Sequence, residues 1–389
     1  MKTLEAVLAA GAICFPAAMF AQGSLTPPGA PAPTMKTLAQ VEPRTPISSV
    51  PYTVTNAGAY YLTTNLSASG AVSGILINTN NVTVDLCGFA MRGVASSGTG
   101  ITVNDNVSNV TLVNGTISGW QYGVFSGFPT KNIHLRDIQA SGNSQVGIYL
   151  GNSGFLESCT ALTNGPVGGI SVGGADSIIR NCIASANAGD GISVRGAGRV
   201  EGCVAAENSG VGLRLSGNMI VAQHCNLYGN ASDGVYTADD DTVRDCVSGG
   251  NKGHGIRASF GCLVAGCSVM GNTSNGIVAG ARSEVRDNIC YGNGTLTGSA
   301  GIFISTNAFN FGGVRVEANH VATGGRGIEV QSTANFIVRN TASANGINYV
   351  IRSNNAVGVI IQPPNSATIS GSTGGAGVGT TDPWANFSF

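Results

Sequence analysis

The sequence has little charge and no basic region. Only 10% of its 389 residues are charged, the formal net charge is −1, and there are four lysines. A chain with so few cations lacks the electrostatic footprint of a nucleic-acid-binding protein. A net charge near zero, together with 42% hydrophobic residues, also excludes disorder driven by charge repulsion. We therefore expect a folded chain without a nucleic-acid partner.

Long apolar runs are also missing, apart from one near the N-terminus. Residues 6–21 are small and apolar and follow Lys2, but they are too few to span a bilayer as a stable helix. We interpret residues 1–23 as a signal peptide for export and the Pro-rich residues 24–49 as a linker. No later segment is apolar enough for a membrane span. The mature chain is predicted to be secreted, periplasmic or attached to the cell surface.

Glycine, in contrast, is abundant, and it recurs in a dipeptide with a branched aliphatic residue. Successive dipeptides lie 21 to 26 residues apart, a period typical of stacked solenoid coils. Their glycines are Gly74, Gly100, Gly123, Gly147, Gly169, Gly191, Gly212, Gly234, Gly255, Gly276, Gly301 and Gly327. We predict an all-β fold, a right-handed parallel β-helix in the form of a three-sided β-solenoid of about twelve coils, over residues 74–365. Residues 50–73 would cap its N-terminal end, and the Gly-rich tail 366–389 would cap the other.

Each coil is predicted to hold three short strands. In the coil that starts at Gly169, alternation places Ile170 and Val172 inward and Ser171 outward. Between the second and third strands the repeat carries residues that tolerate a left-handed backbone, and we predict a one-residue bend there. These residues are Asn114, Asp137, Ser158, Asn181, Gly202, His224, Asp245, Gly266, Asp287 and Asn340.

Cysteine and asparagine recur with the same period. Parallel neighbours on successive coils point the same way, which suits a disulfide poorly, so we expect a column of buried free thiols. The cysteines are Cys159, Cys182, Cys203, Cys225, Cys246 and Cys267. The asparagines precede the glycine dipeptides, and we expect them to form a hydrogen-bonded ladder. They are Asn143, Asn164, Asn187, Asn208, Asn230, Asn251, Asn272 and Asn293.

The repeated elements GISV, SIIRNC and GN, from about residue 74 to about residue 345, resemble the pectate-lyase-like right-handed parallel β-helix repeat family. The resemblance implies the fold and a sugar-binding groove on the outer face of the first strand of each coil. Members of that family include polysaccharide lyases, glycoside hydrolases, uronate epimerases, phage tailspikes and non-catalytic surface proteins. The motifs of its enzyme subfamilies are absent from this sequence, so no subfamily is matched.

The outer face of the first strands carries the predicted substrate-binding residues. Arg214, Tyr236 and Arg257 follow one another on successive coils. Tyr149 belongs to the same row, and Lys252 lies close to it. Arginine offers a fork of donors and tyrosine a stacking face, which together suit a carboxylated or sulfated sugar. The whole predicted row is Phe125, Tyr149, Ser171, Ser193, Arg214, Tyr236, Arg257, Val278, Phe303 and Glu329.

Four residues beside this face are candidates for acid–base catalysis: Asp233, Asp239, Asp240 and His254. Carboxylates near a groove suit the hydrolysis of a glycosidic bond, and a cluster of aspartates also suits calcium, the one cofactor left open. The competing interpretation is a polar turn, in which aspartates are common. The four histidines of the chain have no metal-ligand spacing, so we assign no metal site.

Two functions fit these observations. The first is an exported protein that binds an acidic polysaccharide or cell-surface glycan and, if it is an enzyme, cleaves it as a lyase or glycoside hydrolase. The alternative is a non-catalytic surface, adhesin or structural β-helix. An enzyme needs loops that wall its groove, and coils of 21 or 22 residues leave no room for them. Walls are therefore expected only at the longer coils, 74–100 and 276–327. The oligomeric state is left open.

Overall fold

The structure is a computed structural model, and it describes residues 42–94, 97–294, 298–306, 312–362 and 382–389. The expected signal peptide and most of the expected linker lie outside these residues. The chain divides into two compact units, residues 1–43 and 44–389, and every described strand belongs to the second. Among the described residues, no helix has the length and apolar character needed to span a bilayer.

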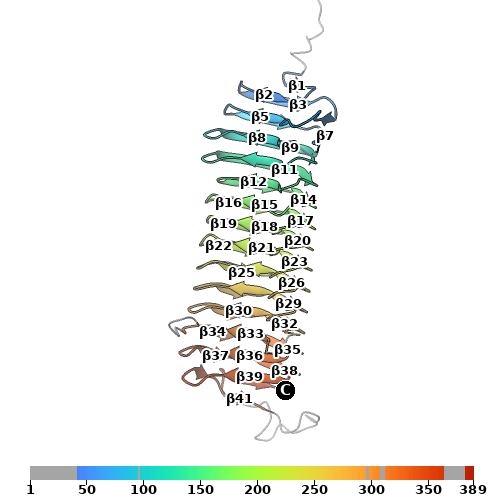
Figure 1. The fold of residues 1–389 in the computed structure, drawn as a ribbon. Coiled ribbons are helices and arrows are strands. Elements are labelled where there is room, and N and C mark those ends of the chain that lie inside the picture. Colours follow the sequence, from blue (N-terminus) through green and yellow to red (C-terminus); the bar gives the residue numbers. More distant parts are fainter. Residues whose placement is uncertain (1–41, 95–96, 295–297, 307–311, 363–381) are drawn as a thin grey trace, which may run out of the picture. The chain divides into compact units, whose positions relative to one another are not determined.

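The strands of residues 44–389 lie on three faces, and the first face is a parallel sheet of fourteen strands, which we call face 1 (Figure 1). Its strands are β2 (Tyr52–Val54), β5 (Ile75–Ile77), β8 (Thr99–Val103), β10 (Tyr122–Ser126), β12 (Val146–Leu150), β15 (Gly168–Val172), β18 (Ile192–Val194), β21 (Leu213–Leu215), β24 (Val235–Tyr236), β27 (Ile256–Ala258), β30 (Ile277–Ala279), β33 (Ala300–Ile304), β36 (Arg326–Val330) and β39 (Ile347–Ile351).

Faces 2 and 3 are two adjacent walls of the solenoid that are joined into one larger parallel sheet. The long strands β9 (Ser108–Ser118) and β11 (Lys131–Ser141) continue from one wall into the other. The other strands of face 2 are β1 (Thr45–Ile47), β3 (Gly58–Leu62), β6 (Val82–Asp85), β13 (Gly154–Glu157), β16 (Ser177–Arg180), β19 (Gly198–Glu201), β22 (Ile220–Gln223), β25 (Thr242–Arg244), β28 (Leu263–Ala265), β31 (Glu284–Arg286), β34 (Arg315–Glu317), β37 (Phe336–Val338) and β40 (Ala356–Val357).

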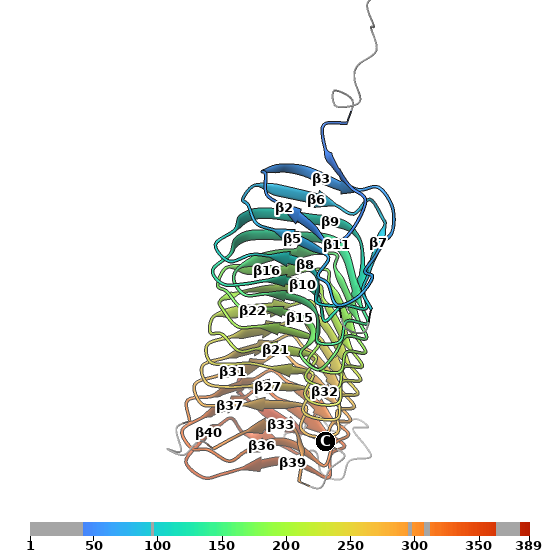
Figure 2. The same ribbon diagram turned by 45° about the horizontal axis from the view of Figure 1, so that its top comes forward.

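Face 3 is made of the third strand of each coil, and its labels run down the right-hand side of Figure 1. Its other strands are β4 (Leu66–Ser67), β7 (Ala90–Arg92), β14 (Thr160–Leu162), β17 (Ile183–Ser185), β20 (Val204–Ala206), β23 (Asn226–Tyr228), β26 (Val247–Gly249), β29 (Ser268–Met270), β32 (Ile289–Tyr291), β35 (His320–Ala322), β38 (Thr341–Ser343) and β42 (Asn386–Ser388), with β41 (Ile360–Ile361) paired to β42. Figure 2 shows successive coils following the same path.

The prediction of an all-β, three-sided parallel solenoid is confirmed, but the predicted number of coils is too low. Face 1 has fourteen rungs instead of about twelve. The two additional rungs, β2 and β39, lack the glycine dipeptide by which the coils were counted. The ladder aligns Tyr52 with Ile75 and Tyr349 with Ile328, so Pro51 and Asn348 occupy the glycine position. Residues 50–73, expected as a cap, thus include the first rung of the stack, and β42 pairs with β38 at the other end.

The glycine of each dipeptide is required by the close approach of the next coil. A Cβ at Gly212 would lie 2.6 Å from Nδ2 of Asn230 and 2.7 Å from the carbonyl oxygen of Gly234. The corresponding Cβ at Gly191 would meet Asn208 and Gly212 in the same way. The dipeptide period is therefore a packing constraint, with the aliphatic residue that follows it buried in the core.

The two predicted columns are present in the interior. Asn208 donates from Nδ2 to the carbonyl oxygen of Ala184 and to Oδ1 of Asn230, both at 3.0 Å, and the same pattern runs from Asn143 to Asn293. All described cysteines are free, and those of the column are at most 1% exposed. After Cys267 the column continues as a second asparagine ladder through Asn288 and Asn319.

The predicted left-handed bend is found at nine of the ten positions, with φ between 52° and 65°. The exception is Asn340, where the prediction is wrong. In these last coils the bends fall at Ala318 and at Arg339, and the latter is one residue before the predicted Asn340. Asn340 is instead a fully buried member of the second asparagine ladder, because it takes the position that cysteine holds in earlier coils.

Candidate functional site

The outward row predicted for face 1 is a continuous ladder. Backbone pairing places its ten residues, from Phe125 to Glu329, on ten successive rungs. Ser171 and Ser193 form a recessed stretch in the middle, only 2% and 7% exposed. The larger side chains of the row therefore fall into an aromatic group before the serines and a mixed group after them.

Tyr236 lies between the two arginines. The guanidinium carbon of Arg214 is 5.2 Å from the centre of its ring, and that of Arg257 is 5.5 Å away. Both distances allow a cation–π interaction, so three of the predicted binding residues are brought together. The arginines differ in their other partners. Nε of Arg214 donates to Oδ2 of Asp190 at 2.5 Å, whereas Nη1 of Arg257 is 4.0 Å from Oδ2 of Asp233.

Tyr149 belongs to the separate aromatic group. Its ring stacks on Phe125 with centres 5.3 Å apart and planes 9° from parallel, and Phe125 meets Tyr122 edge-on at 5.5 Å. Three rungs separate Tyr149 from Arg214, so the structure does not join the two groups in one contact. Lys252 is exposed and lies two residues before His254, at the edge of face 1.

Asp233 and His254 belong to a column that caps the entry to face 1. Oδ1 of Asp233 accepts the backbone N–H of His254 at 2.8 Å, and Nδ1 of His254 accepts that of Asn275 at 3.2 Å. Asp190 and Asn275 do the same for the coils that follow them. Each side chain thus satisfies the amide of the next coil, which is a structural task for residues predicted to be catalytic.

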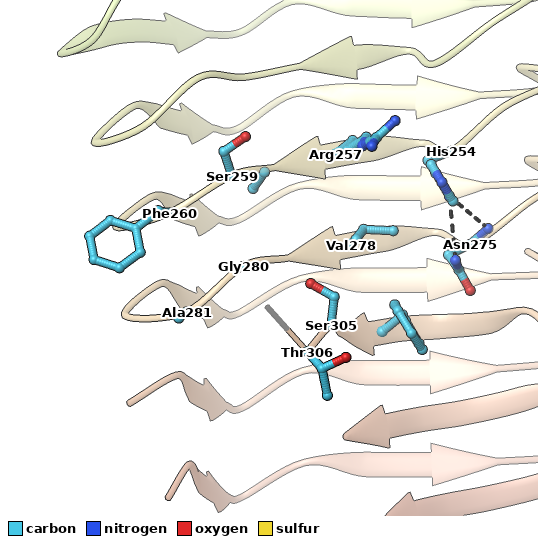
Figure 3. Close-up of a pocket in the computed structure, with 12 residues that line it drawn as sticks. His254, Arg257, Ser259, Phe260, Asn275, Val278, Gly280, Ala281, Ser305 and Thr306 are labelled. Carbon is cyan, nitrogen blue, oxygen red and sulfur yellow. Dashed lines mark hydrogen bonds between the residues drawn. The ribbon is translucent and has the colours of Figure 1, made fainter. Parts of the chain in front are cut away.

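Asp239 and Asp240 lie at the other end of the strand. Oδ1 of Asp239 accepts the backbone N–H of Phe260 at 3.2 Å. Figure 3 shows Phe260 and His254 at opposite ends of β27, so Asp239 and Asp233 are separated by the length of face 1. They are six residues apart, and six residues span up to about 20 Å when they are extended. Paired carboxylates of glycosidases need roughly 5–9.5 Å, so the predicted acid–base cluster is split.

Asp241, which follows the two, is the aspartate with the most unusual environment. It is 1% exposed, and its two oxygens accept the backbone N–H groups of Ile220 and Ala238 at 2.8 and 3.1 Å. Burial raises its pKa to about 6. The buried carboxylate stabilises the turn through these two backbone hydrogen bonds, and it is not accessible to a ligand on face 1.

The hydrogen bond at Nδ1 fixes the role of His254. Burial lowers the pKa of this imidazole, an effect partly offset by the carboxylate of Asp233, so the neutral form is favoured near neutral pH. A neutral ring whose Nδ1 accepts an N–H carries its proton on Nε2. His254 therefore presents a donor at Nε2, which suits hydrogen bonding to a ligand oxygen and does not suit a general base.

A cavity of about 510 Å³ opens on face 1 beside these residues, where the coils lengthen after Gly276 (Figure 3). His254, Arg257, Val278 and Phe303 are among the side chains that line it. Arg257 and Phe303 lie two rungs apart, with the smaller Val278 between them. Two rungs correspond to about 10 Å, so the row forms a trough with a guanidinium on one side and a phenyl ring on the other.

Three features of this site escaped the sequence analysis. Phe303 was placed in the row but not among the binding residues, although its alignment two coils after Arg257 was readable. The two hydrogen bonds from the guanidinium of Arg214 to the carboxylate of Asp190 were not predicted either. Glu329 is only 2% exposed: its Oε1 accepts from Arg326 at 2.6 Å and from Gln331 at 2.9 Å, while Oε2 has no partner among the described residues. No sequence signal indicated that burial.

In the part of the chain that the structure describes, no group of three or more histidine, cysteine, aspartate or glutamate side chains is placed to hold a metal ion. Of the three successive aspartates from Asp239 to Asp241, Asp239 accepts the backbone N–H of Phe260, and Asp241 accepts those of Ile220 and Ala238. The calcium site left open by the sequence has no such ligand group at this turn.

Comparisons with known proteins concern the fold. The family model described as right handed beta helix region matches residues 54–219, 156–289 and 209–373. Similar solved structures include the A-module of mannuronan C-5 epimerase AlgE6 from Azotobacter vinelandii, at 16% identity over 77% of this chain and 89% of that chain, with a TM-score of 0.44. The Dettilon tailspike protein gp208 is 12% identical over 85% of this chain and 62% of that chain, with a TM-score of 0.42. An alginate lyase from Paenibacillus sp. str. FPU-7 is 10% identical over 77% of this chain and 92% of that chain, with a TM-score of 0.35. No curated protein matches the sequence.

Proposed function

The chain belongs to the right-handed β-helix family, as its repeats predicted, and we propose that face 1 binds an acidic polysaccharide without cleaving it. Family membership fixes the fold and leaves the activity open, since one such scaffold hosts many functions. The proposal therefore depends on the side chains of face 1. It keeps the polysaccharide binding of the first function drawn from the sequence and shares the absence of catalysis with the alternative. Export remains a prediction from residues 1–23.

The observation that carries the proposal is the state of Arg257. Its side chain is 53% exposed, it lines the cavity, and the nearest carboxylate oxygen, on Asp233, is 4.0 Å away. Arg214, held by Asp190, has fewer donors to offer. The donors of Arg257 are available to a carboxylate of the ligand, and an arginine fork binds such a group with two parallel hydrogen bonds.

The rest of the trough suits a sugar ring. Phe303 offers an apolar surface opposite Arg257 for the C–H groups of a pyranose, and Nε2 of His254 offers a donor to a hydroxyl or carboxylate oxygen. The row continues toward Tyr236, which supplies a second stacking surface. A polymer running along the solenoid axis would therefore meet Arg214, Tyr236 and Arg257 on three consecutive rungs, and Phe303 two rungs beyond Arg257.

The same residues argue against cleavage. Asp233 and Asp239 each accept a backbone amide of the next coil and lie at opposite ends of a strand, so they do not form a carboxylate pair. His254 donates from the nitrogen that would have to accept a proton. A lyase or hydrolase would need a base that the described part of this trough does not offer.

Binding is tested by titrating the full chain with oligomers of a polyuronate and with their methyl esters. We expect the acid form to bind and the ester to bind at least tenfold more weakly, because the ester cannot form the charged pair with Arg257. Arg257→Gln should lose about tenfold in affinity for the acid form. Arg199→Gln, which removes an exposed arginine from face 2, is the matched control and should bind normally.

Equal affinity for acid and ester, or equal loss in both variants, would reject the proposed site. The same samples are monitored for unsaturated uronates and for new reducing ends. We expect neither from the wild-type chain. Turnover that disappears in His254→Ala would overturn the non-catalytic part of the proposal.

A further inference from the structure

Face 3 differs from the other faces in carrying no charge along its central stretch. Each strand from β11 to β38 directs two side chains outward there, in two columns. The first column is Gln139, Thr160, Ile183, Val204, Asn226, Val247, Ser268, Ile289, His320 and Thr341. The second column is Ser141, Leu162, Ser185, Ala206, Tyr228, Gly249, Met270, Tyr291, Ala322 and Ser343. Neither column contains an aspartate, glutamate, lysine or arginine.

The outward positions of face 2 over the same coils show what a solvated face looks like in this chain. They carry Glu157, Arg180, Arg199, Glu201, Arg244, Glu284, Arg286, Arg315 and Glu317. Face 3 instead exposes large apolar side chains, including Ile289 at 55% and Tyr291 at 58%. Contiguous exposed apolar surface of this kind marks an interaction site on a soluble protein.

The sizes of the side chains in the second column are arranged with two-fold complementarity. The midpoint of the ten strands lies between β23 and β26, and four of the five pairs of positions equally far from it combine a large residue with a small one, the outermost pair being Ser141 and Ser343. Tyr228 is opposite Gly249, Met270 is opposite Ala206, Tyr291 is opposite Ser185, and Leu162 is opposite Ala322. The large members are 38% to 58% exposed, while Ala206 and Ala322 are recessed at 2% and 8%.

We propose that face 3 is the interface of an antiparallel homodimer, in which a second copy of this chain packs about a two-fold axis between β23 and β26. Such an isologous contact requires a self-complementary patch, and this arrangement inserts each large side chain into a recess of the other copy. Because the face is uncharged, two copies meet without repulsion between like charges.

The available area reaches the minimum that a specific contact between two copies needs. Ten rungs at about 4.8 Å and three residues per strand at about 3.3 Å give roughly 500 Å² of flat face per copy. The total of about 1,000 Å² reaches the lower bound for a specific interface, before the relief of the side chains is counted. Face 1 stays free in both copies, so the dimer is compatible with the proposed glycan site.

The first test is the mass of the full chain in solution, by light scattering or sedimentation over a range of concentrations. We expect a dimer for the wild-type chain and a monomer for Tyr228→Arg, which places an unpaired charge at the centre of the interface. Thr242→Arg adds the same charge on face 2 and should remain dimeric. A wild-type monomer at all concentrations, or a Tyr228→Arg dimer, would overturn the proposal.

The second test fixes the orientation with a short bismaleimide. Ser185→Cys combined with Tyr291→Cys should give a covalent dimer, because each residue faces the other across the axis while the two are five rungs apart within one chain. Neither single variant should cross-link beyond the wild-type background. Cross-linking by a single variant would overturn the antiparallel arrangement. A monomer whose Tyr228→Arg variant loses affinity for polyuronate would assign face 3 to the glycan instead.

Discussion

At the scale of single residues, position along the strand decides what each polar side chain does. Asp233, His254 and Asn275 precede the first strands of their coils, where the backbone turns and its N–H groups need acceptors. Arg257 lies within a strand and points outward from its middle. The polar side chains at the edge of the trough are therefore held by structural hydrogen bonds, whereas Arg257 remains available to a ligand.

The lowered pKa of His254 predicts a measurable dependence of stability on pH. The unfolded chain takes up a proton at this residue near pH 6.5, whereas the folded chain resists protonation until a lower pH. The unfolded state therefore binds more protons in this window, and stability is lost as the pH falls below about 6.5. We expect the urea midpoint to fall less between pH 7.5 and 5.5 in His254→Gln, which keeps an acceptor for Asn275, than in the wild-type chain.

His320→Gln serves as the comparison, because His320 is exposed on face 3 and has no such hydrogen bond among the described contacts. It should keep the wild-type pH dependence. A His254→Gln variant with an unchanged pH profile would contradict the assignment of a neutral, half-buried imidazole.

At the scale of the strand and its corner, the asparagine ladder holds the coils together. Every member from Asn143 to Asn272 bonds to the next asparagine and to a backbone carbonyl, and all are buried. Because each amide both donates and accepts along the axis, the removal of one member leaves buried partners on both sides without a hydrogen bond.

We predict that Asn208→Ala lowers the free energy of unfolding by about 3 kcal/mol, since it leaves the Asn187 amide and the Ala184 carbonyl unsatisfied. Denaturant unfolding followed by circular dichroism measures the effect. Asn218→Ala removes an exposed asparagine two residues before β22 and should change stability by less than about 0.5 kcal/mol. Equal effects in the two variants would show that the ladder is dispensable.

The elements were predicted from the sequence wherever one residue type recurs at one position. Glycine, asparagine and cysteine each mark a fixed place in the coil, so their period gave the strands, the ladder and the thiol column. The terminal rungs were missed because Pro51 and Asn348 replace the glycine there. Asn340 was misplaced because asparagine suits both a left-handed bend and a buried ladder, and only the register separates the two.

The site was less predictable for a physical reason. Asp233 and Asp239 are close in sequence, but an extended strand between them carries them to opposite ends of the face. Proximity along a strand is a poor guide to proximity in space, whereas residues one coil apart lie about 4.8 Å from each other. The row with Arg214, Tyr236 and Arg257 was predicted correctly because its members are one coil apart from each other.

At the scale of the whole molecule, the solenoid is one continuous core closed to solvent. Eight of the nine described cysteines are buried within it, and Cys87 is half-buried. Burial raises the pKa of the Cys262 and Cys290 thiols, which removes the reactive thiolate as well as access to it. Thiol reactivity in this chain should therefore report the opening of coils.

We predict that a maleimide labels none of the buried cysteines in the native chain and all of them in denaturant, as read by peptide mass spectrometry. The labelling of Cys182 and Cys267 should appear together along a denaturant series if the central coils open cooperatively. Labelling of either cysteine under native conditions would contradict the closed core.

The central claim, that face 1 is the glycan-binding face, is tested most directly by hydroxyl-radical footprinting with and without a polyuronate oligomer. Aromatic side chains on two faces serve as internal reporters. We predict that the oligomer protects Tyr236, Phe260 and Phe303 and leaves the oxidation of Tyr228 and Tyr291 on face 3 unchanged. Protection confined to face 3, or no protection at Tyr236, Phe260 and Phe303, would contradict the claim.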